Sequence, residues 1–200
     1  MCIKLDSVSK SFGEKVVLRD FSLELPESGA VALMGPSGCG KTTLIRLLAG
    51  LEKPDGGTVA VQYNRLSIVF QEDRLLGGVS ALGNVYAVLG RGKKQLALDW
   101  LERMGLKNDS RLLPGNMSGG MRRRLAIARA MAYGGDLLLL DEPFAGLDEA
   151  TRKRIYPHIF CDGNAPRLSV LVTHDRQEAE CYAQRLIVFE GPPLTVVEVV

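Results

Sequence analysis

The residues with the clearest chemistry lie in segment 35–43, which reads Gly-Pro-Ser-Gly-Cys-Gly-Lys-Thr-Thr. The pattern G-x-x-x-x-G-K-[ST] builds a tight loop whose backbone N–H groups converge on phosphate oxygens at a helix N-terminus. Glycine suits such a loop because a side chain would block the approach of the phosphate. Lys41 is predicted to reach the β- and γ-phosphates, and the Thr42 hydroxyl to bind Mg²⁺. The predicted nucleotide-binding residues of this loop are Gly35, Pro36, Ser37, Gly38, Cys39, Gly40, Lys41, Thr42 and Thr43.

Such a loop requires a strand before it and a helix after it. The apolar run 30–34 predicts the strand, and the periodic apolar residues of 44–51 predict the helix. The motif alone leaves open a glycine-rich turn that binds no ligand, although its flanks favour a phosphate site.

Polar side chains also follow three other apolar runs that are typical of buried strands. In open α/β sheets, ligands bind at the carboxyl ends of the strands, so we expect these side chains to lie near the loop. They are Gln71, Asp141, Glu142 and His174.

Each of these residue types has a matching role. Asp141 is predicted to hold Mg²⁺ together with Thr42 and Gln71. Because side chains alternate along a strand, Glu142 should point away from Asp141, towards an attacking water, as a general base or orienting group. His174 can both donate and accept a hydrogen bond, and so could bridge a γ-phosphate and a water. The predicted catalytic residues are therefore Lys41, Gln71, Glu142 and His174. The alternative for Asp141 and Glu142 is a pair of solvent-exposed acids at the end of a strand.

The rest of the chain is predicted to form an α/β fold with a largely parallel sheet. Alternating apolar residues at 3, 5, 8 and at 21, 23, 25 predict half-buried antiparallel strands, followed by strands over 58–61 and 66–70. Helices are expected over 81–89, 93–104 and 119–133, and then strands over 137–140 and 169–172 alternate with helices over 148–160 and 175–183. We therefore predict one domain over 1–200, with a core of 1–71 and 135–200 and an inserted helical subdomain over about 72–134.

Composition excludes several classes of protein. The net charge of +2 is too small for bulk nucleic-acid binding, and the basic run Arg122–Arg124 is interpreted as a solvated helix face. The four cysteines form no C-x-x-C pair, which argues against a zinc knuckle or a redox motif. Cys39 is interpreted as a small residue that fits the loop; a reactive thiol, suggested by its position next to a helix N-terminus, is the alternative. Segment 1–6 lacks the apolar core of a signal peptide, and no apolar run reaches the length of a membrane span.

Segment 117–130, Met-Ser-Gly-Gly-Met-Arg-Arg-Arg-Leu-Ala-Ile-Ala-Arg-Ala, resembles the signature segment of ABC-type ATPases, whose usual form is close to L-S-G-G-Q. The phosphate loop, Gln71, the Asp-Glu pair, segment 145–148 and His174 match the other motifs of that family in order, over 5–191. Met121 in place of Gln resembles importers of the nitrate, sulfonate and taurine group.

This resemblance implies a P-loop NTPase (RecA-like) core with a small N-terminal antiparallel β subdomain. It implies two ATP molecules and Mg²⁺ held between two copies in a head-to-tail dimer. It adds nucleotide-binding roles for an aromatic residue that stacks on adenine, for the signature residues and for the aspartate of segment 145–148. These residues are Phe12, Ser118, Gly119, Gly120 and Asp148.

The function that the resemblance implies is the ATPase subunit of a bacterial importer, peripheral on the cytoplasmic face of the membrane. Its partners would be separate permease subunits and a solute-binding protein. Docking is expected over 72–84 through Leu75, Leu76 and Val79, for which ordinary core burial is the equal alternative. An exporter ATPase, or an ABC ATPase with a mechanical role such as cell division, is the alternative function.

Overall fold

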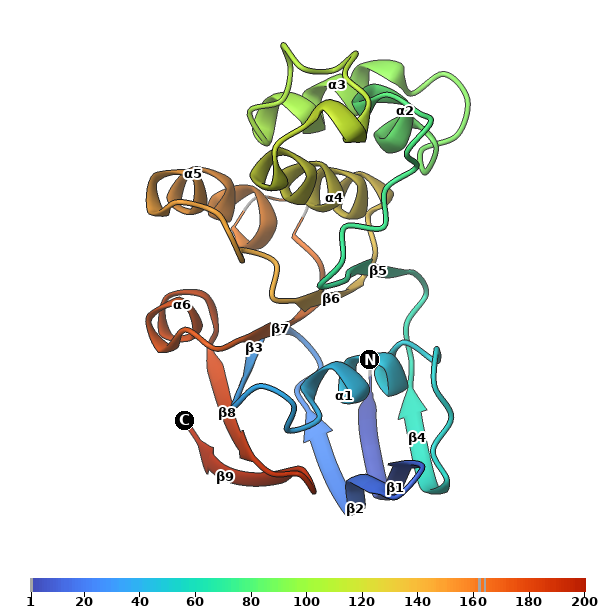
Figure 1. Ribbon diagram of the computed structural model, residues 1–200, viewed down its shortest axis with the longest axis vertical. Helices are drawn as coiled ribbons and strands as arrows, with labels where there is room; N and C mark the ends of the chain where they lie inside the picture. The colour runs from blue at the N-terminus through green and yellow to red at the C-terminus, as the bar shows by residue number, and fades with distance from the viewer. Residues whose placement is uncertain (1, 162, 164) are drawn as a thin grey trace. The chain divides into compact units, whose positions relative to one another are not determined.

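The computed structural model describes residues 2–161, 163 and 165–200, so Met1, Asp162 and Asn164 lie outside the described residues. It divides into two compact units (Figure 1). The first, here called the sheet unit, combines the N-terminal stretch up to Ile68 with 136–142 and 167–200. The second, the helical unit, combines 69–135 with 143–166.

A six-stranded, mainly parallel sheet forms the centre of the sheet unit, in the order β5-β6-β7-β3-β8-β9. β3 is parallel to both β7 and β8, β6 is parallel to β7, and β9 runs antiparallel to β8. The predicted fold class is confirmed, but β8 and β9 were missed. The strands are β3 (Gly29–Met34), β5 (Leu66–Val69), β6 (Leu137–Asp141), β7 (Leu168–Thr173), β8 (Arg185–Glu190) and β9 (Thr195–Val199).

The central strands are mainly apolar because both faces of the sheet are covered. Every residue of β6 and β7 is buried. Val31 and Leu33 of β3 belong to a core shared with α1 (Lys41–Leu48) and the antiparallel strands. Ala32, on the other face, packs with α6 (Arg176–Tyr182). The carboxyl ends of these strands are thereby held at fixed positions along one edge.

The antiparallel sheet has the order β2-β1-β4 and is built from β1 (Ile3–Phe12), β2 (Lys15–Leu25) and β4 (Gly56–Val61). Leu5 and Val8 both point into the core although they are three positions apart. A bulge explains this, because Asp6 and Ser7 both lie opposite Ser22.

Ser7 at this bulge has a φ of 49°, and its N–H donates to Ser22 Oγ over 2.9 Å. On the neighbouring strand, a Cβ on Gly57 would lie 2.3 Å from the carbonyl oxygen of Ser7. Glycine is therefore required at position 57 for β4 to pair with the bulged strand.

In the helical unit, α2 (Ala81–Tyr86), α3 (Lys94–Arg103) and α4 (Gly119–Tyr133) pack against one another (Figure 1). α4 has the predicted bounds, whereas α2 is shorter than predicted and ends at Tyr86. The unit also contains α5 (Glu149–Phe160) and a short 3₁₀ turn over Pro114–Asn116. In the part of the chain that the structure describes, no helix combines the length and the apolar character that a membrane crossing demands.

Candidate nucleotide site

The glycines of the 35–40 loop are required by the fold as well as by a phosphate. The loop leaves β3 after Met34 and enters α1 at Lys41, with Gly40 as the N-cap at a φ of 125°. A Cβ on Gly35 would lie 2.6 Å from the carbonyl oxygen of Phe189 on β8. The backbone is therefore drawn tightly against the sheet, and the first N–H groups of α1 face the loop as an anion site requires.

Lys41 folds back over its own loop. Its Nζ donates to the carbonyl oxygens of Gly35 over 2.7 Å and Pro36 over 2.8 Å, and the residue is 6% exposed. A phosphate oxygen that enters the loop must therefore replace these carbonyls as the acceptor. Cys39 beside it is fully buried, which favours a small residue that fits the loop over a reactive thiol.

Thr42 and Asp141 meet at the ends of α1 and β6. Thr42 Oγ1 donates to Asp141 Oδ2 over 2.9 Å, and Asp141 is 3% exposed. A hydroxyl and a carboxylate oxygen side by side are the hard oxygen donors that Mg²⁺ prefers. The donor set therefore fits the predicted metal ion.

Glu142 directly follows Asp141, the last residue of β6. Its φ is 48°, and its N–H donates to the carbonyl oxygen of Val172 over 3.0 Å. A non-glycine residue in this region of φ costs energy and is frequent at functional sites. Glu142 Oε1 lies 3.6 Å from Nδ1 of His174, whose side chain is 67% exposed. The structure thus pairs the two predicted catalytic side chains on neighbouring strand ends.

The turn that carries His174 is fixed on both sides. Asp175 caps α6 by accepting from the N–H groups of Gln177 over 2.9 Å and Glu178 over 3.2 Å. The Thr173 hydroxyl accepts from the Asp175 N–H over 3.1 Å and donates to the buried carboxylate of Glu178. These contacts fix the backbone on both sides of His174. The position of its exposed imidazole is therefore set by its neighbours in the chain.

A pocket of about 740 Å³ lies beside the phosphate loop. Its walls include the predicted site residues Ser37 and His174. They also include residues 188–191, at the end of β8 and directly after it, which were not predicted as site residues. The sequence could have indicated residues 188–191, because the apolar run 186–189 is followed by the polar residue Glu190, as the other predicted strands are followed by polar residues. Phe12, at the end of β1, is 45% exposed, with Lys10 Nζ 5.2 Å from the centre of its ring.

The predicted signature residues lie in the helical unit, at the start of α4. Ser118 caps the helix, and its Oγ accepts from the N–H of Met121 over 3.2 Å. A Cβ on Gly120 would lie 3.3 Å from Cδ2 of Leu147, so this end of α4 packs on segment 145–148. The N–H groups of the first turn and the positive end of the helix dipole therefore lie at this N-terminus.

Asp148 caps α5 in the same unit. Its two carboxylate oxygens accept from the Thr151 N–H and hydroxyl, each over 2.8 Å. These hydrogen bonds, the backbone one first, hold the pKa of Asp148 below its usual value. The carboxylate is therefore positioned and ionised at neutral pH.

The prediction of a solvated face for Arg122–Arg124 is wrong. Arg123 is 4% exposed, and Arg122 and Arg124 are only partly exposed. Arg122 donates to the carbonyl oxygen of Met117 over 2.7 Å, and Arg124 donates to that of Met104 over 2.7 Å. The run of three arginines suggested exposure to solvent. A guanidinium can nevertheless be buried when carbonyl groups accept hydrogen bonds from its several N–H groups.

Gln71 contributes its backbone to this cluster, since its carbonyl oxygen accepts from Arg123 over 3.3 Å. Its exposed side chain remains the predicted ligand for metal or water. Of the candidate docking residues, Leu75 is half-buried, whereas Leu76 and Val79 are 47% and 37% exposed. Asn84, fully buried, holds their loop by donating to the carbonyl oxygens of Leu76 over 3.1 Å and Val79 over 2.9 Å.

Comparison with known proteins agrees with this geometry. The sequence profile of the ABC transporter family matches residues 18–145. The chain belongs to the ABC transporter family. Within this family it is 42% identical over 197 residues to an aliphatic sulfonates import ATP-binding protein of Rhodococcus jostii (strain RHA1), which covers 96% of the chain and 72% of that relative. A protein of the same name from Burkholderia thailandensis is 40% identical over 195 residues, covering 94% of the chain and 58% of the relative.

Solved ABC structures share the fold. The ATP-binding cassette MJ0796, in a dimeric post-hydrolysis state bound to ADP and Pi, gives a TM-score of 0.84 at 28% identity, with 99% of this chain and 97% of that chain covered. A second dimeric structure of the same cassette gives 0.82 at 29% identity, with 93% of each chain covered. The predicted family and the ATP-binding cassette fold are thereby confirmed.

Proposed function

We propose that this chain is the ATP-hydrolysing subunit of a bacterial ABC importer. The observation that carries the proposal is the pairing of Thr42 with Asp141 and of Glu142 with His174, on strand ends beside the loop that Lys41 closes. The names of the relatives from Rhodococcus and Burkholderia support import as the direction of transport. The same names disfavour the exporter and the mechanical ATPase that the sequence had left open.

Each side chain then has a definite task. Lys41 exchanges its two loop carbonyls for phosphate oxygens, and the N–H groups at the start of α1 complete the phosphate cradle. Glu142 orients the attacking water and accepts its proton, and His174 holds that water against the γ-phosphate. Phe12 offers the exposed part of its ring to the adenine.

The residues that would hold Mg²⁺ are Thr42 and Asp141, with Gln71 as a further ligand. When bound there, Mg²⁺ neutralises charge on the β- and γ-phosphate oxygens. The Thr42–Asp141 hydrogen bond prepares the two donors for this task, because it fixes both oxygens before the nucleotide arrives.

We further propose that two copies associate head to tail and hold ATP between them. The N-terminus of α4, with Ser118, Gly119 and Gly120, would then meet the γ-phosphate held by the other copy, and Asp148 would lie at the same interface. The dimeric states of the related cassette support this arrangement.

The permease partner is proposed to dock on Leu76 and Val79, whose exposed apolar side chains stand on a loop that Asn84 braces. A solute-binding protein would deliver the solute, and the subunit would lie peripherally on the cytoplasmic face of the membrane. The relatives make organic sulfonates the first solutes to test.

A genetic and biochemical experiment tests this proposal. Purified protein should release phosphate from Mg-ATP, and Glu142→Gln should abolish that release. In the source organism, deletion of the gene should abolish uptake of one solute, and only the wild-type gene should restore uptake. Retained uptake together with an efflux defect would overturn the importer assignment.

A further inference from the structure

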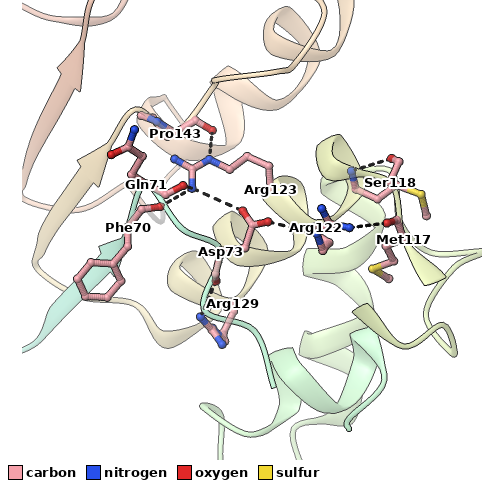
Figure 2. Close-up of polar contacts among 10 residues, drawn as sticks. Phe70, Gln71, Asp73, Met117, Ser118, Arg122, Arg123, Arg129 and Pro143 are labelled. Atoms are coloured by element: carbon pink, nitrogen blue, oxygen red, sulfur yellow. Dashed lines mark hydrogen bonds and ion pairs between the residues drawn. The ribbon is translucent and has the colours of Figure 1, made fainter. Parts of the chain in front are cut away.

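One side of α4 carries three arginines that hold the backbone of segment 70–74, which contains Gln71. We call Arg122, Arg123 and Arg129 the arginine clamp (Figure 2). Arg122 and Arg129 are seven positions apart and therefore lie on one face of the helix. The clamp lies entirely within the helical unit.

Arg123 is the centre of the clamp. Its Nε donates to the carbonyl oxygen of Pro143 over 2.9 Å. Its Nη1 donates to the carbonyl oxygens of Phe70 and, over 3.3 Å, Gln71, and lies 3.7 Å from Asp73 Oδ1. A guanidinium that is 4% exposed is thus surrounded mainly by backbone acceptors.

The other two arginines extend the grip along the same segment. Arg122 Nε lies 3.5 Å from Asp73 Oδ2. Arg129 donates to the carbonyl oxygens of Arg74 over 3.0 Å and Asp73 over 3.4 Å. Segment 70–74 is an irregular stretch, so these side chains take the place of the hydrogen bonds that a helix or strand would supply.

The segments joined in this way are those on which hydrolysis depends. Ser118 caps the start of α4, the clamped segment carries Gln71, and Pro143 directly follows Glu142 in the chain. We infer that Arg123 is a positioning residue that makes the start of α4, the Gln71 loop and the turn after Glu142 move as one body. This inference rests on the proposed function, because it assigns to Arg123 the alignment of that same ATPase site.

Arg123 should affect the rate of hydrolysis but not the affinity for ATP. The phosphate loop that binds ATP belongs to the sheet unit, whereas Arg123 belongs to the helical unit. Loss of Arg123 should therefore lower kcat and leave the Kd of ATP almost unchanged. If Arg123 merely filled the core, its loss would destabilise the protein and would therefore weaken ATP binding as well as lower kcat.

The test compares Arg123→Met and Arg123→Lys with the wild type. Methionine keeps most of the volume without the donors, and lysine keeps the charge without the planar fork that spans Pro143 and Gln71. Arg91→Met is the matched control, because Arg91 is an exposed arginine of the same unit. The measurements are kcat, the Kd of ATP, and hydrogen–deuterium exchange of the peptide that covers 70–75.

We expect Arg123→Met to lower kcat by about tenfold or more, with a Kd within about twofold of the wild type. Deuterium uptake should rise in 70–75 and stay at the wild-type level in the peptide that covers α3. Arg123→Lys should recover only part of kcat, and Arg91→Met should match the wild type. Unchanged uptake in 70–75, or an unchanged kcat in Arg123→Met, would overturn the inference.

A second variant covers the case in which Arg123→Met fails to fold. Asp73→Asn removes the charge that faces Arg122 and Arg123 and leaves the backbone contacts in place. It should raise uptake in 70–75 and lower kcat severalfold, and wild-type values of both would contradict the clamp. Absence of hydrolysis in the wild type would instead contradict the proposed function, and the exchange of 70–75 would still decide the inference.

Discussion

Replacing Thr42 by valine removes one hydroxyl and keeps nearly the same shape. That hydroxyl donates to Asp141 over 2.9 Å, and Asp141 is 3% exposed, so water has little access to replace the donor. A hydrogen bond to a charged group contributes about 1.5–3 kcal/mol. We therefore expect Thr42→Val to lower the free energy of unfolding by about 2 kcal/mol.

Thr42→Val should also change the Mg²⁺ dependence, because it removes the hydroxyl ligand of the proposed metal site. Titration of Mg²⁺ into the protein with ATP, followed by nucleotide fluorescence, should therefore require a markedly higher Mg²⁺ concentration in Thr42→Val. Thr195→Val, at an exposed position of β9, is the control and should change stability by less than about 0.5 kcal/mol.

A double-mutant cycle isolates the Thr42–Asp141 pair. Urea unfolding of Thr42→Val, Asp141→Ala and the double variant gives the coupling free energy between the two side chains. We expect a coupling of at least about 1 kcal/mol. A coupling near zero would refute the view that Thr42 and Asp141 hold each other in place for the metal ion.

Three further changes test separate parts of the structure. His174→Ala should lower kcat more strongly than it raises the Kd of ATP, and a normal turnover would remove His174 from the mechanism. Ser118→Ala should remove the cap of α4 at a cost of about 1 kcal/mol in thermal unfolding, and an unchanged melting curve would show that the cap contributes nothing. Partial burial raises the pKa of Asp136, but hydrogen bonds from the N–H groups of Asn64 and Arg65 outweigh it. The pKa of Asp136 therefore lies below its ordinary value. The carboxylate therefore stabilises the fold above about pH 4, and this contribution is lost as pH falls through the lowered pKa. Asp136→Asn should weaken the fall in stability at acid pH, and an identical fall in urea unfolding would contradict that origin.

Much of the nucleotide site could be predicted from the sequence because its parts are local. Segment 35–43 carries its own loop geometry, and α4 has both a capping serine and a regular apolar pattern, so its bounds were predicted correctly. The strand-end position of Asp141 and Glu142 followed from the apolar run before them. In each case the information lay within a few residues of the feature.

Contacts between distant segments could not be predicted in this way. Arg123 resembles a surface charge in the sequence, and its burial depends on carbonyl groups of Phe70 and Pro143, which are far from it along the chain. The bulge at Ser7 is visible only as an irregular spacing of apolar residues until the pairing with Ser22 is known. The sequence likewise carried no signal for the positive φ of Glu142 or for its hydrogen bond to Val172 of β7.

Mixing two inactive variants tests the proposed shared site most directly. Lys41→Ala disables the phosphate loop of one copy, and Ser118→Arg blocks the N-terminus of α4 in the other, so neither variant alone should hydrolyse ATP. Random association of equal amounts should place about half of the protein in mixed dimers with one intact site, which predicts up to about a quarter of the wild-type phosphate release. Activity of the mixture no higher than that of the two separate variants would contradict a nucleotide held between two copies.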